Sequence, residues 1–375
     1  MPVHIKNSLI GSAATIVAAL AICAALRREG FITWVAYLGV VPVPMMLVAG
    51  FLWRIDPPQF LHRLRQPARG MRLAILTLAS AVAGAAFLYW GPGRGAGPTP
   101  MLVMAAIVSV VATFWVVVVW RCWPLSTALK HPLPLGIAAW LVSYGVGFLA
   151  FVRLFNFDFM AAAAIYSPIA DPHGAFNAWR SLVFLVTTTG VISVFSKLFA
   201  YWPVASLPGS ARPACFALYA SLYVLALSAL AIELGVHLIG MDQVDFMVEV
   251  PVSLIFGTFL VTSMTRFRLL GGWPQPAKGT LLLVIGGGFG AALFALYAWI
   301  APLLAGESLV KGPPHYSLEL WIATAMLSVT FPLIILFANY FDLWPLERGN
   351  TTAGAWRGRV SRDRFGAEHP IRKTL

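Results

Sequence analysis

The chain has 375 residues, of which 59% are hydrophobic and only 11% are charged. Soluble globular proteins carry about 25% charged residues, and disordered chains combine low hydrophobicity with high charge, so the composition excludes both classes. The net charge of +12 does not indicate a nucleic-acid partner, because such proteins need a basic groove with interleaved aromatic residues. The composition indicates an integral membrane protein.

Ten apolar runs follow one another along the chain. A helix needs roughly 20 apolar residues to cross about 30 Å of hydrocarbon, whereas the strands of a membrane β-barrel alternate over about 10 residues. We therefore predict an all-α, polytopic integral membrane protein with about ten transmembrane helices. The runs lie near residues 8–26, 31–53, 73–90, 101–120, 133–152, 181–200, 214–236, 246–265, 279–303 and 320–341.

The basic residues predict the orientation of these helices. With both termini inside, 20 Lys and Arg residues fall in cytoplasmic segments and 6 fall outside, which is the bias expected for cytoplasmic loops. We predict a bacterial-type inner (plasma) membrane protein with both termini cytoplasmic. Residues 1–345 form a single transmembrane domain, and residues 346–375 form a basic tail near the anionic inner leaflet. The lipid bilayer is the first predicted partner.

A Trp-Pro pair recurs after the even-numbered runs. The five tryptophans are separated by 70, 79, 71 and 71 residues, which predicts five parallel helical hairpins as internal repeats. Tryptophan prefers the membrane interface and proline ends a helix, so we interpret these residues as interfacial anchors. They are Trp53 (in a degenerate form of the pair), Trp123, Trp202, Trp273 and Trp344.

A hydroxyl precedes each true Trp-Pro pair by 14 or 15 residues: Ser109, Thr188, Thr258 and Thr330. At about 1.5 Å per residue it lies roughly 21 Å inward, past the middle of the bilayer. Ser and Thr often support helix packing in membranes. The alternative is that the even runs line a polar path for a small solute, and under that interpretation the double substitution Thr188→Val and Thr258→Val should reduce flux.

Ionisable side chains are missing from the middle of every apolar run. This argues against a carrier coupled to a buried carboxylate and favours a neutral or amphipathic solute. Lys197, near the cytoplasmic end of its run, can extend to the interface. No Walker A, G-x-S-x-G or His-Glu-x-x-His motif occurs, so the sequence favours a protein that is not an enzyme and does not hydrolyse ATP. Gly286, Gly287, Gly288 and Gly290 predict close helix packing.

Acidic and histidine side chains gather on the predicted outer face. Glu233 and His237 share one helix face, and Asp242, Asp245 and Glu249 follow; Asp158, Asp171 and His173 lie in the connection 153–180. These groups form a solvated acidic rim, or they hold a divalent metal. No other cofactor is predicted. Connection 153–180 is long for a helical bundle, and we expect a short interfacial or re-entrant helix in it.

The sequence leaves three functions open. The first is a permease or channel-like transporter for a small solute, with a path between the even runs. The second is a non-catalytic membrane subunit that docks a membrane or periplasmic partner through the outer loops or the basic tail. The third is an intramembrane metal-dependent enzyme that uses the outer Glu, His and Asp side chains. The solute, the energy source and the oligomeric state do not follow from the residues.

Overall fold

The computed structural model describes residues 3–26, 30–61, 64–95, 97–161, 166, 168–169, 171–265, 269–270, 272–313 and 315–346. Within them, ten helical segments are long and apolar enough to cross a membrane, which indicates a multi-pass membrane protein. We number them as spans 1 to 10: Ile5–Ala25, Phe31–Leu52, Ala68–Trp90, Pro100–Val119, Pro132–Leu154, Ala178–Lys197, Pro213–Leu238, Gln243–Met264, Ala277–Ala305 and Ser317–Tyr340. Residues 347–375 of the predicted tail lie outside the described residues.

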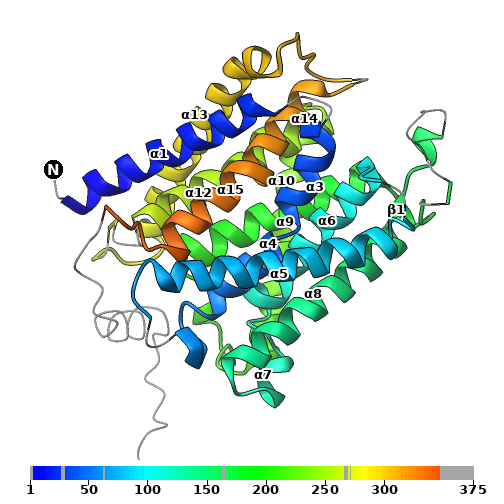
Figure 1. Ribbon diagram of the computed structural model, residues 1–375. Helices are drawn as coiled ribbons and strands as arrows, with labels where there is room; N and C mark the ends of the chain where they lie inside the picture. The colour runs from blue at the N-terminus through cyan, green and yellow to red at the C-terminus, as the bar shows by residue number, and fades with distance from the viewer. Residues whose placement is uncertain are drawn as a thin grey trace, which may run out of the picture.

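The spans contain both α-helical and π-helical segments (Figure 1). The α-helices are α1 (Val3–Ala25), α3 (Ala36–Val40), α4 (Val43–Leu47), α5 (Ala68–Trp90), α6 (Pro100–Thr113), α7 (Leu125–Ala128), α8 (Pro132–Leu154), α9 (Ala178–Lys197), α10 (Pro213–Ile232), α11 (Gln243–Met247), α12 (Ser253–Met264), α13 (Ala277–Ala305), α14 (Ser317–Ala323) and α15 (Phe331–Ile335). The π-helical segments are Phe31–Val35, Val48–Leu52, Phe114–Val119, Glu233–Leu238, Val248–Val252, Thr324–Thr330 and Leu336–Tyr340. Short 3-10 turns cover Gln59–Leu61, Asp158–Met160 and Val204–Ser206.

The ten predicted apolar runs are confirmed as helices. The largest difference in position is at span 3, which begins at Ala68 and not near residue 73. Gln66 explains the earlier start, because its side-chain oxygen accepts a hydrogen bond from the Gly70 amide at 3.2 Å and so satisfies one of the free amides of the first helical turn.

Even-numbered and odd-numbered spans differ sharply in burial. In spans 2, 4, 6, 8 and 10, between 61 and 78% of the most apolar stretch is buried, against 28 to 39% in the odd-numbered spans. A helix that is hydrophobic on every side and buried belongs to the core of a bundle. The even-numbered spans are therefore the inner helices, and the odd-numbered spans are the outer helices that separate them from lipid.

The inner helices form a closed ring in the order 2, 4, 6, 8, 10 and back to 2. Each neighbouring pair is in contact: α3 with α6, α6 with α9, α9 with α12, α12 with α15, and α3 with the π-helical segment Thr324–Thr330. The last contact closes the ring between the two ends of the chain. There the Ser328 hydroxyl donates to the Ala36 carbonyl at 3.1 Å, and a Cβ on Gly39 would lie 2.1 Å from the Ser328 carbonyl oxygen.

The outer helices cover the junctions between inner helices with one constant offset. Span 1 contacts spans 8 and 10, span 3 contacts 10 and 2, span 5 contacts 2 and 4, span 7 contacts 4 and 6, and span 9 contacts 6 and 8. In Figure 1, α1 (blue) accordingly runs beside α15 (orange), although the two come from opposite ends of the chain. Each outer helix thus leaves its own hairpin partner and packs against earlier inner helices.

Three of the Trp-Pro pairs have the same local backbone. The two residues before Trp123, Trp202 and Trp344 have positive φ angles between 50° and 67°. In each case the second of them donates its amide to the carbonyl six residues earlier, which ends the helix in the Schellman pattern. These bonds are Cys122 to Val116, Tyr201 to Phe195 and Leu343 to Phe337, at 2.8, 3.0 and 3.0 Å.

Two ends of the bundle need names. We call the end where the inner helices finish, with Trp53, Trp123, Trp202 and Trp344, the Trp-Pro end. The opposite end carries Asp242, Asp245, Glu249 and Glu319, and we call it the acidic end. Hydrogen bonds from Gln66 to Tyr340 and from Gln275 to Leu198 join loops and inner helices at the Trp-Pro end, while Asp242 accepts from Tyr316 at the acidic end.

The connection between spans 5 and 6 differs from the expected short helix in its described part. Phe155–Asn156 (β1) pairs in parallel with Phe176–Asn177 (β2), and Asp158–Met160 forms a single 3-10 turn. The two strands bring both ends of the connection together. Residues 162–165, 167 and 170 lie outside the described residues.

Candidate functional site

Each inner helix contributes one side chain to a contact cluster inside the ring. The members are Phe51 of span 2, Phe114 of span 4, Lys197 of span 6, Phe259 of span 8 and Phe331 of span 10. We call this cluster the aromatic constriction. It takes side chains from all five inner helices and from no outer helix, so it lies where the five helices face one another.

The contacts within the constriction cross the ring. Span 8 is next to spans 6 and 10 only, yet the Phe259 ring lies 6.3 Å from the Phe51 ring of span 2 and 6.2 Å from the Phe114 ring of span 4. The Phe331 ring is 4.7 Å from the Phe259 ring. Helices that are not neighbours in a closed ring can touch only across its axis. The phenyl rings therefore fill the axis, with edge-to-face geometry typical of packed aromatic pairs.

Lys197 is the charged member of the constriction. Its Nζ atom lies 4.4 Å from the centre of the Phe51 ring and 4.2 Å from that of Phe259, within the range of a cation–π contact. The sequence predicted that this side chain could extend to the interface, but the structure directs it across the inner ring. Phe114, Phe259 and Phe331 are 1, 0 and 3% exposed, so the ammonium group borders a closed apolar plug.

The four predicted path hydroxyls are all buried, but only one lacks a hydrogen-bond partner. Ser109 donates to Ala105 at 3.1 Å and Thr188 to Leu185 at 2.7 Å, within their own helices. Thr330 donates to Ala325 at 2.7 Å and bonds the Tyr297 hydroxyl of span 9 at 2.6 Å. The Thr258 hydroxyl has no partner. Thr258 precedes Phe259 and thus offers a buried hydroxyl beside the constriction.

The predicted interfacial tryptophans differ in exposure. Trp202, Trp273 and Trp344 are 36, 53 and 36% exposed, and Trp123 is half-buried. Trp53 is 1% exposed and donates its indole N–H to the Pro132 carbonyl at 2.8 Å. The indole of Trp53 therefore links span 2 to the start of span 5, where Gly136 leaves room for its ring.

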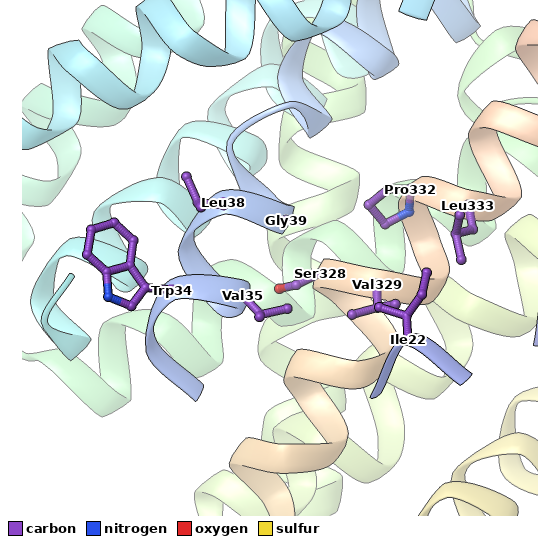
Figure 2. Close-up of a pocket in the computed structure, with 9 residues that line it drawn as sticks. All are labelled: Ile22, Trp34, Val35, Leu38, Gly39, Ser328, Val329, Pro332 and Leu333. Atoms are coloured by element: carbon purple, nitrogen blue, oxygen red, sulfur yellow. The ribbon is translucent and has the colours of Figure 1, made fainter. Parts of the chain in front are cut away.

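A groove of about 350 Å³ opens on the side of the bundle at the point where the ring closes (Figure 2). Ile22 of span 1, Trp34 to Gly39 of span 2 and Ser328 to Leu333 of span 10 line it. Ser328 supplies its polar side chain, and that hydroxyl already donates to Ala36. The groove is apolar and contains none of the four predicted path hydroxyls.

At the acidic end, three of the predicted cation ligands meet partners that the sequence did not single out. Lys311 pairs with Glu249 and lies 4.0 Å from the Asp245 carboxylate. Asp242 caps α11 through the Val244 amide at 2.8 Å and accepts from the Tyr316 hydroxyl at 3.0 Å. That hydroxyl has its pKa raised to about 12, first by burial and then by the bond to Asp242.

The other predicted metal ligands form two separate pairs of positions. Glu233 and His237 lie 4.0 Å apart with both side chains more than half exposed. Asp158, Asp171 and His173 each place one ligand atom within 4.8 Å of the others, and they are the group of metal-type side chains found within the described residues. The Asp171 carboxylate is already bonded by the Phe157 amide, the Tyr166 hydroxyl and the His173 amide. Metal binding at either place stays a prediction.

The sequence could have signalled Phe259 only indirectly. Phenylalanine is common in every span, and no spacing relates the five members of the constriction, which lie between 2 and 14 residues before the Trp of their hairpin. Their convergence depends on the tilt and order of the inner helices. No protein-family model matches the chain, and neither a curated protein nor a solved structure matches it significantly.

Proposed function

We propose that the protein is a channel-like transporter whose path follows the axis of the five inner helices and is closed by the aromatic constriction. The observation that carries this proposal is that all five inner helices, and no outer helix, supply a side chain to one cluster across the ring. Hydrophobic constrictions close membrane paths by excluding water. Displacing one phenyl ring would be enough to admit water.

Lys197 changes the solute that we propose. The absence of charge from the middle of the spans favoured a neutral or amphipathic solute, but the Lys197 ammonium group lies against the plug itself. Lysine rings and single lysines in narrow paths attract anions. We therefore propose a small anion as the solute, which moves down its own gradient because the sequence has no ATP-hydrolysing motif.

The architecture supports five hairpin repeats in one transmembrane domain. Each outer helix packs at the same offset against the ring, and three Trp-Pro pairs share one backbone geometry. Duplication of a hairpin gives this regularity directly. Together with the bias of basic residues, we propose a bacterial-type inner-membrane protein with the Trp-Pro end and both termini in the cytoplasm.

Phe259→Ala tests the constriction. In proteoliposomes we expect chloride flux to rise by at least about tenfold over wild type, which corresponds to a barrier lower by ~1.4 kcal/mol. Phe289→Ala is the matched control, because Phe289 is on outer span 9 and 44% exposed; it should leave flux unchanged. Phe114→Ala serves as a second opening variant if Phe259→Ala does not fold.

The same assay separates the two solute classes. Adding Lys197→Gln to the open variant should lower chloride flux and leave glycerol flux unchanged. If glycerol flux rises in Phe259→Ala and chloride flux does not, the anion assignment is wrong and the neutral solute is favoured. If neither flux exceeds that of the Phe289→Ala control, the path does not run through the constriction.

A further inference from the structure

The acidic end contains a second unusual group of side chains, centred on Glu319 in the first turn of α14. Glu319 is 2% exposed. One of its oxygens accepts the Gly312 amide at 3.1 Å, while the other is buried without a hydrogen-bond partner. A buried carboxylate oxygen with no donor is strongly unfavourable, so this atom calls for a partner.

Asp245 of span 8 supplies the neighbouring group. Its side chain is close enough to hydrogen-bond with the Glu319 carboxyl, and its Oδ1 atom is likewise buried without a partner. Two carboxylates at such a distance repel each other in a site shielded from water. One proton between them removes the repulsion and gives both unpartnered oxygens a hydrogen bond at once.

The remaining charges around the pair are already matched. Lys311 binds Glu249 and approaches the Oδ2 atom of Asp245, not its unpartnered Oδ1. Asp242 accepts the Tyr316 hydroxyl and two amides of α11. The first turn of α14 favours a single negative charge at Glu319. The site thus accommodates one charge for two carboxyl groups, and the two buried oxygens leave room for a proton more readily than for a metal ion with its several ligands.

We propose that Glu319 and Asp245 hold one proton between them and form a proton-binding site at the acidic end of the inner ring. The site is formed by spans 8 and 10 and by the connection 306–316, and it is separate from the aromatic constriction. It goes beyond the proposed transport function and does not depend on it. The protonated pair joins the two inner helices, and its deprotonation would loosen this end of the bundle.

Two neighbours of the pair titrate outside the range of interest. Burial and the bond to Asp242 raise the pKa of Tyr316 to about 12, and the bond to Glu249 raises the pKa of Lys311 above its ordinary value. Both groups therefore keep their protons through neutral and mildly alkaline pH. A transition in that range would belong to the carboxyl groups of Asp242, Asp245, Glu249 and Glu319, and among these only Asp245 and Glu319 have unpartnered buried oxygens.

Infrared spectroscopy of the purified protein in detergent tests the proposal without any transport assay. We expect a protonated-carboxyl C=O band at neutral pH that is lost in Glu319→Gln and in Asp245→Asn. Glu233→Gln is the control, since the Glu233 side chain is 71% exposed; it should keep the band. A spectrum without the band in wild type, or a band retained in both Glu319→Gln and Asp245→Asn, would overturn the proposal.

Thermal unfolding as a function of pH gives an independent readout. The folded protein would hold one proton more than the unfolded chain, in which both carboxyls are ionised, so its stability must fall as pH rises. From about pH 6 to about pH 9, well above ordinary carboxyl pKa values, the Tm of wild type and Glu233→Gln should fall and that of Glu319→Gln should change less. Equal pH slopes in all three proteins, or a Tm raised by Ca²⁺ in wild type but not in Glu319→Gln, would contradict a proton site.

Discussion

Thr258 illustrates how much a single hydroxyl depends on its surroundings. Ser109, Thr188, Thr258 and Thr330 occupy the same distance from their Trp-Pro pairs, yet three of them bond to carbonyls of their own helices. Ser and Thr side chains in helices commonly make this bond. Only the Thr258 hydroxyl remains available beside Phe259, so the four positions are not equivalent for a solute.

Thr258→Val should separate binding from folding. The substitution removes a buried hydroxyl without a partner, so we expect Tm to stay unchanged or to rise slightly. In the Phe259→Ala background, chloride flux should fall roughly tenfold, because a hydrogen bond to a charged group contributes about 1.5–3 kcal/mol. Thr188→Val is the matched control and should leave flux unchanged. A loss of flux in both variants, or in neither, would contradict the special role of Thr258.

At the scale of helices, spans 8 and 9 show the closest packing in the bundle. A Cβ on Gly257 would lie 1.8 Å from the Gly286 carbonyl oxygen, and one on Gly290 would lie 2.2 Å from that of Ser253. Small residues allow membrane helices to approach in this way. The glycine run 286–290 was predicted to pack closely, and this is confirmed for Gly286 and Gly290, whereas Gly288 has nothing within 4 Å of an added Cβ.

Gly257→Ala should therefore destabilise the protein. The new methyl group meets backbone atoms that cannot rotate away, and overpacking of this kind costs about 1–3 kcal/mol. We expect a clear drop of Tm in detergent. Gly288→Ala, on the open side of the same helix pair, should unfold at the wild-type temperature. A Gly257→Ala protein as stable as Gly288→Ala would show that the two helices are further apart than described.

The irregular helices belong to the same scale. Most of the π-helical segments lie in inner spans 2, 4, 8 and 10, and Pro251 sits inside one of them. Such segments are frequent at functional sites. Phe51 and Phe114 belong to two of these segments and Phe331 directly follows a third, so the aromatic constriction is built largely on helix irregularities.

At the scale of the whole molecule, the alternation of inner and outer spans fixes which loops share a side of the membrane. Loop 201–212 follows span 6 and connection 306–316 follows span 9, so three crossings separate them. The excess of basic residues assigns the first to the cytoplasm.

Cysteine labelling tests this topology. In a variant without Cys23, Cys122 and Cys215, Ser206→Cys and Ser308→Cys place one thiol in each loop, at exposed positions. In intact bacterial cells, a membrane-impermeant maleimide should label position 308 but reach position 206 only after permeabilisation. Labelling of both positions from the same side would mean that one of spans 7 to 9 does not cross the membrane.

The sequence by itself determined the elements of this protein. Apolar runs of about 20 residues predict membrane helices because the bilayer offers no partner for free backbone groups, and all ten were confirmed to within a few residues. The positions of the Trp-Pro pairs and the glycines of span 9 were equally local. The sequence did not contain the order of the helices around the ring or the identity of the residues on its axis.

Only the tertiary structure decided which side chains meet. Phe51, Phe114, Lys197, Phe259 and Phe331 share no spacing, and Glu319 and Asp245 lie 74 residues apart, so neither group is visible as a motif. Their convergence requires ring closure between spans 10 and 2 and the packing of spans 8 and 10, which are long-range contacts. Periodicity and hydropathy report only how each residue meets its immediate surroundings, and they are silent on which helix lies opposite.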